Sequence, residues 1–137
     1  MTKSVLVIED NEDIRENTVE MLELAGYKTF MAENGNKGVE LALKEKPSLI
    51  ICDIMMPGLD GYGVLQLIRK DPQTEDIPLI FLTAIADRNE FRKRMTIGHD
   101  DFIPKPFEER DLLNVVDARL KKAALLQNLY NPSSLNG

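Results

Sequence analysis

Short apolar runs alternate with longer amphipathic segments along the chain. Three of these runs are uninterrupted and rich in branched side chains, which is typical of strands buried on both faces of a sheet. They are residues 5–8, 49–52 and 79–82. Residues 28–32 are more polar and predict an edge strand. Residues 102–103 predict a short fifth strand that Pro104 and Pro106 limit.

Five further segments, one after each predicted strand, carry apolar residues at near-helical spacing. Their apolar positions are Ile14, Val19, Met21 and Leu22; Val39, Leu41, Ala42 and Leu43; Tyr62, Leu65 and Ile68; Phe91, Met95 and Ile97; and Leu112, Leu113, Val116 and Leu120. Asp60 is placed to cap the start of the third segment, and Pro47 limits the second. Gly26 and Gly98 follow the first and fourth segments as C-caps. Strands that alternate with helices predict an α/β fold, a parallel sheet with helices on both faces.

Composition and charge narrow the class of protein. A length of 137 residues suits one domain, and a net charge of -6 argues against general nucleic-acid binding by this domain. The single cysteine excludes an internal disulfide and favours a reducing compartment, so we expect a cytoplasmic protein. No stretch approaches the roughly 20 apolar residues of a membrane span, so we expect no membrane association.

Polar side chains follow four of the predicted strands. Glu9 and Asp10 come after the first strand and Asp53 after the third. Thr83 follows the fourth strand and Lys105 follows the fifth. Because ligands bind at the carboxyl ends of the strands in an open parallel sheet, we expect these side chains to converge there.

This set of groups suits phosphoryl transfer. Three neighbouring carboxylates repel one another unless a cation neutralises them, and a hard ion such as magnesium prefers oxygen ligands. Asp53 has the chemistry of a nucleophile, because a carboxylate can form an aspartyl phosphate. Magnesium, the Lys105 ammonium and the Thr83 hydroxyl can each take one oxygen of the transferred group.

The sequence resembles the receiver domain of two-component response regulators over about residues 3–120. The matching positions are Glu9 and Asp10; Asp53; residues 56–61, Met-Pro-Gly-Leu-Asp-Gly; Thr83 and Ala84; and Gly98, Asp100, Asp101, Phe102, Lys105, Pro106 and Phe107. Each motif is weak alone, but their order and spacing together are specific. The resemblance implies a flavodoxin-like (βα)5 fold with strand order 2-1-3-4-5.

The resemblance also implies a role for each site residue. Glu9 and Asp10 would bind magnesium, Glu9 through water. Asp53 would be both a metal ligand and the phosphoryl acceptor. The backbone carbonyl of Met55 would supply a further metal oxygen. Lys105 would pair with the phosphoryl group.

Two structural features follow from the same resemblance. The Lys105–Pro106 peptide bond is expected to be cis. Thr83 and Phe102 would form a switch, in which the hydroxyl moves to the phosphoryl group and the aromatic ring turns inward behind it. Taken singly, Thr83 also suits an ordinary strand-end hydroxyl, and Phe102 suits a core residue.

Glu9, Asp10, Lys105 and His99 have simpler interpretations too. Glu9 and Asp10 could cap the first helix, which is compatible with metal binding. Lys105 could be a surface lysine. His99 stands where the family usually has a small residue, and we interpret it as a solvated side chain.

The implied function is a signalling switch that a histidine kinase or a phosphotransfer protein phosphorylates, rather than an enzyme that turns over an external substrate. We assign residues 1–122 to the receiver domain and residues 123–137 to an extension of the last helix with a short disordered tail. No output domain follows in this sequence, so we expect a downstream protein partner or relay to another phosphotransfer protein.

Three other functions are alternatives. A phosphatase of the haloacid dehalogenase type would need a second acid two residues after Asp53, where Met55 stands. A flavodoxin-type binding module would need a phosphate-cradling loop after the first strand, where residues 9–13 are largely acidic. A receiver that takes no phosphate would be a scaffold, and the complete acidic set argues against it.

Two finer hypotheses concern lifetime and assembly. In this family the positions of Met55 and Ile85 tune hydrolysis; both side chains are apolar here, which predicts a long phosphoryl lifetime. The last helix is expected to reach about Tyr130 and to carry a coiled-coil seam that would allow a homodimer. The seam positions are Leu113, Val116, Leu120, Ala123, Gln127 and Tyr130. The alternative is that the first half of this helix covers the sheet and its second half frays.

Overall fold

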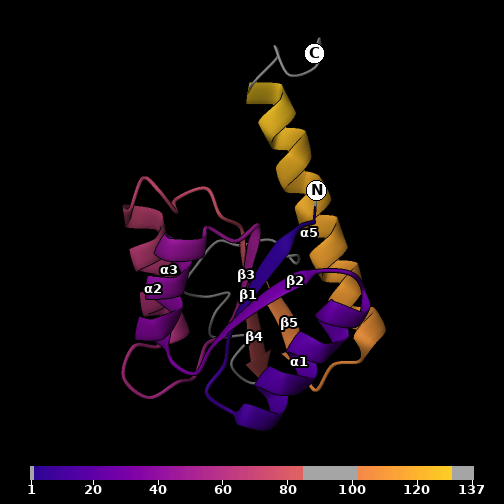
Figure 1. Cartoon of the computed structure of the whole chain (residues 1–137). Coiled ribbons are helices and arrows are strands. Elements are labelled where there is room, and N and C mark those ends of the chain that lie inside the picture. Colours follow the sequence, from indigo (N-terminus) through magenta and orange to yellow (C-terminus); the bar gives the residue numbers. More distant parts are fainter. Residues whose placement is uncertain (1, 85–101, 131–137) are drawn as a thin grey trace.

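The structure, a computed structural model, describes residues 2–84 and 102–130. Its centre is a five-stranded parallel sheet with strand order β2-β1-β3-β4-β5 (Figure 1). The strands are β1 (Ser4–Ile8), β2 (Lys28–Ala32), β3 (Leu49–Asp53), β4 (Leu79–Ala84) and β5 (Phe102–Lys105). The flavodoxin-like order and the parallel sheet predicted from the sequence are therefore confirmed.

Four helices are described. They are α1 (Glu12–Leu24), α2 (Gly35–Glu45), α3 (Gly61–Lys70) and α5 (Glu109–Tyr130). In Figure 1, α2 and α3 cover one face of the sheet, and α1 and α5 cover the other. The predicted fourth helix, together with Ile85, Gly98 and His99, lies outside the described residues.

Alternate side chains of β1, β3 and β4 enter two separate cores. The strands give the core beneath α2 and α3 the residues Leu6, Ile8, Ile50, Cys52 and Phe81. They give the core beneath α1 and α5 the residues Val5, Val7, Leu49, Ile51, Ile80 and Leu82. A strand that faces a core on both sides needs an apolar residue at every position, which explains the uninterrupted runs in the sequence.

Side-chain caps and turn residues set the helix ends. Asp60 caps α3 as predicted, because its side chain accepts a hydrogen bond from the Gly63 N–H at 2.9 Å. At the end of α1, the C-cap is Ala25, and Gly26 follows it with a φ of 96°. The glycine therefore supplies the left-handed conformation one residue after the cap, where a side chain would be strained.

The register of the sheet brings the candidate site residues together. Ile8 of β1 lies opposite Cys52 of β3. The next residues, Glu9 and Asp53, therefore lie side by side at the carboxyl ends of these neighbouring strands. Ala84 of β4 lies opposite Lys105 of β5. All these residues lie at the carboxyl edge of the sheet, as expected.

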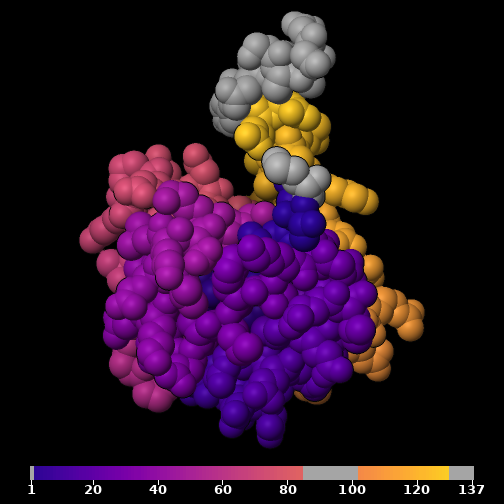
Figure 2. All heavy atoms as spheres, in the orientation of Figure 1, coloured from indigo at the N-terminus to yellow at the C-terminus, as the bar shows by residue number. Residues whose placement is uncertain are grey.

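The last helix continues well beyond the sheet. Its second half projects from the body of the molecule (Figure 1; Figure 2). Leu125 and Leu129 on this half have exposed fractions of 63% and 67%. None of the described helices has both the length and the apolar character needed to cross a membrane.

Candidate functional site

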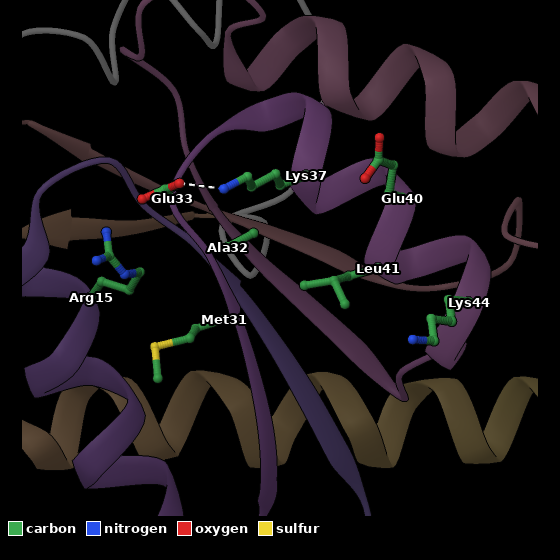
Figure 3. A pocket seen from close by; sticks show the side chains of 8 residues that line it. All are labelled: Arg15, Met31, Ala32, Glu33, Lys37, Glu40, Leu41 and Lys44. Atoms are coloured by element: carbon green, nitrogen blue, oxygen red, sulfur yellow. Dashed lines mark hydrogen bonds and ion pairs between the residues drawn. The ribbon is translucent and has the colours of Figure 1, made fainter.

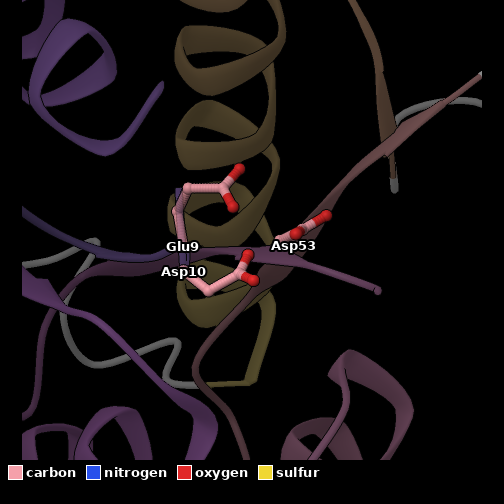
Figure 4. A group of neighbouring side chains, drawn as sticks. All are labelled: Glu9, Asp10 and Asp53. Carbon is pink, nitrogen blue, oxygen red and sulfur yellow. The ribbon is translucent and has the colours of Figure 1, made fainter. Parts of the chain in front are cut away.

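Three carboxylates converge at the carboxyl edge of the sheet. One oxygen of each of Glu9, Asp10 and Asp53 lies within 4.8 Å of the others (Figure 4). Glu9 is fully buried and Asp53 is 6% exposed, whereas Asp10 is open to solvent. The acidic cluster, as we call these three residues, therefore combines two sheltered carboxylates with one that faces the solvent.

The corner after β1 is held by several hydrogen bonds. The Glu9 N–H donates to the carbonyl oxygen of Ala32 at 3.1 Å, and the Asn11 N–H donates to Oε2 of Glu9 at 3.2 Å. The guanidinium of Arg15 donates to the carbonyl oxygen of Glu9 at 2.9 Å. The side chain that caps α1 is Asn11, which accepts from the Ile14 N–H at 3.0 Å, so neither acid serves as the helix cap.

Lys105 neutralises part of this acidic cluster. Its ammonium lies 2.7 Å from Oε1 of Glu9 and 3.1 Å from Oδ1 of Asp53. The interpretation of Lys105 as a simple surface lysine is therefore wrong. The Lys105–Pro106 peptide bond, which directly follows, is cis.

The protonation of the site reflects burial and crowding. Burial raises the pKa of Glu9 from 4.5 to about 7; Lys105 opposes this rise, and the Asp53 carboxylate adds to it. Burial also raises the pKa of Asp53, although Lys105 acts against it. Burial alone would lower the pKa of Lys105, but its contacts with Glu9 and Asp53 outweigh burial and raise it. One ammonium thus compensates three carboxylates incompletely, and a divalent cation with oxygen ligands fits the remaining charge.

Thr83 and Phe102 lie on the adjoining strands. The Thr83 side chain is buried, and its hydroxyl donates to the carbonyl oxygen of Ala84 at 3.0 Å. Phe102 is 5% exposed and belongs to the core beneath α2 and α3. In this structure Thr83 therefore makes a local strand-end contact and the ring of Phe102 is already inside the protein.

The loop after Asp53 packs tightly against the site. A Cβ atom on Gly61 would lie 2.6 Å from the carbonyl oxygen of Asp53 and 2.8 Å from Cα of Ile54. Both neighbours are backbone atoms, so the first residue of α3 must be glycine to approach this closely. Within the same loop Gly58 has a φ of 75°, a second position that favours glycine.

A groove of about 490 Å³ lies near the acidic cluster, beside the end of β2 and between α1 and α2 (Figure 3). Its lining includes Arg15, Met31, Glu33, Lys37 and Leu41. The Lys37 ammonium is paired with the Glu33 carboxylate. Arg15 lines this groove and also contacts the backbone of Glu9, and no motif in the sequence points to it.

Comparison of the sequence with known proteins identifies relatives over nearly the whole chain. The family model of the response regulator receiver domain matches residues 5–117. The probable transcriptional regulator ycf27 of Porphyridium aerugineum is 36% identical over 137 residues, which cover 98% of this chain and 56% of that protein. The phosphate regulon transcriptional regulatory protein PhoB of Pseudomonas aeruginosa is 36% identical over 120 residues, which cover 88% of this chain and 52% of that protein. The chain therefore spans about half the length of these curated relatives.

Solved structures give the same result. A putative response regulator of Chloroflexus aurantiacus superposes with a TM-score of 0.81 at 30% identity, covering 88% of this chain and 99% of that one. The chemotaxis response regulator CheY4 of Vibrio cholerae superposes with a TM-score of 0.78 at 26% identity, again covering 88% and 99%.

Proposed function

The chain belongs to the response regulator receiver domain family, and on that premise we propose that Asp53 is the phosphoryl acceptor of a signalling switch. One observation carries the proposal. The Asp53 carboxylate ends the central strand β3, with two further carboxylates within 4.8 Å and an ammonium at 3.1 Å. A nucleophile placed among cation ligands and beside a fixed positive charge is what transfer of a phosphoryl group requires.

We assign the acidic cluster to magnesium. Glu9, Asp10 and Asp53 would hold the ion, with Glu9 acting through water and the backbone carbonyl of Met55 as a further ligand. When bound, magnesium would supply positive charge that offsets the oxygens of the transferred group. The oxygen-only donor set and its incompletely compensated charge support this assignment.

The protein groups have separate tasks in the transfer. A carboxylate oxygen of Asp53 attacks phosphorus, and the bond to the donor nitrogen or oxygen breaks. Lys105 already lies beside Asp53, so its ammonium needs little movement to bind a phosphoryl oxygen. The Thr83 hydroxyl would exchange its contact with the Ala84 carbonyl for the phosphoryl group, and Phe102 would respond as the second member of the switch.

The phosphoryl donor would be a histidine kinase or a phosphotransfer protein. We infer that the chain promotes its own phosphorylation and dephosphorylation and turns over no external substrate. A haloacid dehalogenase type of phosphatase would place its second acid at Met55, where this chain has an apolar side chain that is 65% exposed.

The relatives are about twice as long as the part of them that this chain matches. Several of them are named transcriptional regulators. For this domain, with a net charge of -6, we propose cytoplasmic signalling through a downstream protein partner rather than direct nucleic-acid binding. We retain residues 1–122 as the receiver domain and residues 123–137 as an extension of the last helix with a tail.

A homodimer through α5 is a further proposal, and the structure narrows the residues available for it. Val116 is fully buried against the molecule's own sheet, and Leu113 and Leu120 pack in the same core. The first half of the predicted seam is therefore occupied, so a dimer would have to use the projecting half, where Leu125 and Leu129 are exposed. Light scattering on the full chain and on a chain cut after Lys121 tests this, since only the full chain should give the mass of a dimer.

The phosphoryl lifetime is also open to test. We propose a long lifetime because neither Met55 nor Ile85 can orient an attacking water; Ile85 lies outside the described residues. Met55→Asn or Ile85→Glu should speed decay of the phosphorylated protein. An unchanged decay rate in both variants would contradict this idea.

Mass spectrometry after incubation with acetyl phosphate or phosphoramidate tests the central proposal. Wild type should gain one phosphate in the presence of magnesium and none after its removal by chelation. Asp53→Ala should gain none, whereas Asp13→Asn, which removes an exposed acid on α1 outside the acidic cluster, should behave as wild type. A folded wild type that gains no phosphate would remove the proposal and leave the scaffold function.

A further inference from the structure

Arg15 donates a hydrogen bond to the backbone of the acidic cluster. It lies in the first turns of α1, and its Nη1 donates to the carbonyl oxygen of Glu9 at 2.9 Å. That carbonyl belongs to the peptide group that joins Glu9 to Asp10. Arg15 therefore holds the one peptide group that lies between two members of the acidic cluster.

The orientation of this peptide group affects both neighbouring side chains. A peptide is planar, so its rotation changes ψ of Glu9 and φ of Asp10 together. Glu9 has further restraints, since its N–H donates to Ala32 and its carboxylate contacts Lys105. Asp10 is exposed, and the direction of its carboxylate depends more directly on the peptide group that Arg15 fixes.

We propose that Arg15 is a positioning residue for the divalent-cation site, because it fixes the peptide between Glu9 and Asp10 and so keeps their carboxylates directed at a shared ion. This inference rests on the proposed magnesium site. Groups that orient metal ligands commonly change metal affinity by about tenfold or more when they are removed.

The positive charge of Arg15 repels the same cation. The direction in which magnesium affinity changes when Arg15 is removed therefore distinguishes a charge effect from a positioning effect. If Arg15 acted only through its charge, its removal would relieve repulsion and strengthen magnesium binding. If it acts by positioning, its removal weakens magnesium binding. Glu33 beside it in the groove, as Figure 3 shows, offsets part of the positive charge.

Arg69 provides a matched control. Its guanidinium likewise donates to backbone carbonyls, those of Glu75 at 3.0 Å and Ile77 at 2.7 Å. It lies near the end of α3, which leads back to the opposite edge of the sheet from the acidic cluster. Arg69→Met thus removes one positive charge and arginine–carbonyl hydrogen bonds at a distance from the site.

The experiment uses the full chain and measures the magnesium dissociation constant by calorimetry, with urea unfolding of the metal-free protein alongside. We expect Arg15→Met to raise the dissociation constant about tenfold. Arg69→Met should leave it at the wild-type value even where it lowers stability. Arg15→Lys keeps the charge, but its shorter side chain does not place a donor where Nη1 of Arg15 lies, so this variant should also bind magnesium more weakly than wild type.

The outcomes separate this inference from the proposed function. If wild type binds magnesium and Arg15→Met binds it equally well or better, the positioning role is wrong and the magnesium site stands. If wild type binds no magnesium, both are wrong. Should Arg15→Met fail to fold, Arg15→Lys decides, and a wild-type dissociation constant in that variant overturns the proposal.

Discussion

The stability of the metal-free protein should fall as pH rises, because of the acidic cluster. The pKa of Glu9 is raised to about 7 in the folded protein, against 4.5 for an ordinary glutamate. Between these values the folded state holds a proton that the unfolded state releases. The contribution of Glu9 to stability is therefore present below about pH 4.5 and is lost as the pH rises through 7.

The magnitude follows from the same two values. Between pH 5 and pH 8 the free energy of unfolding should fall by about 2 to 3 kcal/mol on account of Glu9. The pKa of Asp53 is also raised, so it acts in the same direction. The pKa of Lys105 is raised above 10.5, so this residue keeps its charge throughout the window.

Urea unfolding in the presence of a chelator, at several pH values, measures this change. Glu9→Gln has a similar shape but no charge, so its free energy of unfolding should depend on pH less steeply than that of wild type by about 2 kcal/mol over this range. Excess magnesium should restore wild-type stability most strongly at high pH, where the carboxylates are ionised. If wild type and Glu9→Gln lose stability in parallel, the pKa of Glu9 is not raised and the reasoning fails.

Three other substitutions test contacts that the structure shows, one of them beside Asp53 and two at the opposite edge of the sheet. Tyr27→Phe removes the hydrogen bond from the phenol to Asp117 and should cost about 1 kcal/mol in urea unfolding; spectrophotometric titration of wild type should show a tyrosine with a pKa near 12 that the variant lacks. Gly61→Ala forces a methyl group against the Asp53 carbonyl and should cost about 2 to 3 kcal/mol and slow phosphorylation, whereas normal values of both would show that the loop adapts. Thr74→Val removes the buried hydroxyl that donates at 2.8 Å to a carbonyl in α3; it should cost about 1 to 2 kcal/mol in thermal unfolding and leave phosphorylation unchanged.

The sheet could be predicted because its buried strands share one sequence pattern, an uninterrupted run of apolar residues. A strand segment with cores on both faces is apolar at every position, as residues 5–8 of β1, 49–52 of β3 and 79–82 of β4 are, so these runs stand out from the amphipathic helices between them. Once the strands are placed, the parallel arrangement itself brings Glu9, Asp53 and Lys105 to one edge.

Contacts between side chains and the backbone were harder to predict. Arg15 lies among polar residues of α1, and nothing in the sequence distinguishes it from an ordinary helix-surface arginine. Its hydrogen bond to the Glu9 carbonyl depends on the orientation of α1 relative to the end of β1. The same holds for Asn11, which caps α1 in place of the neighbouring acids, and for Gly61, whose necessity depends on how closely α3 approaches β3.

The contacts of Lys105 also determine when, during synthesis of the chain, the site becomes complete. This residue lies 96 positions after Glu9 and 52 after Asp53 in the chain, yet its ammonium touches both. During synthesis the two acids emerge long before their cationic neighbour, and the strand that carries Lys105 is the last of the sheet. An unfinished chain therefore holds Asp53, the proposed phosphoryl acceptor, without the neighbouring ammonium, so capacity for phosphorylation should appear only when the final strand has joined the sheet.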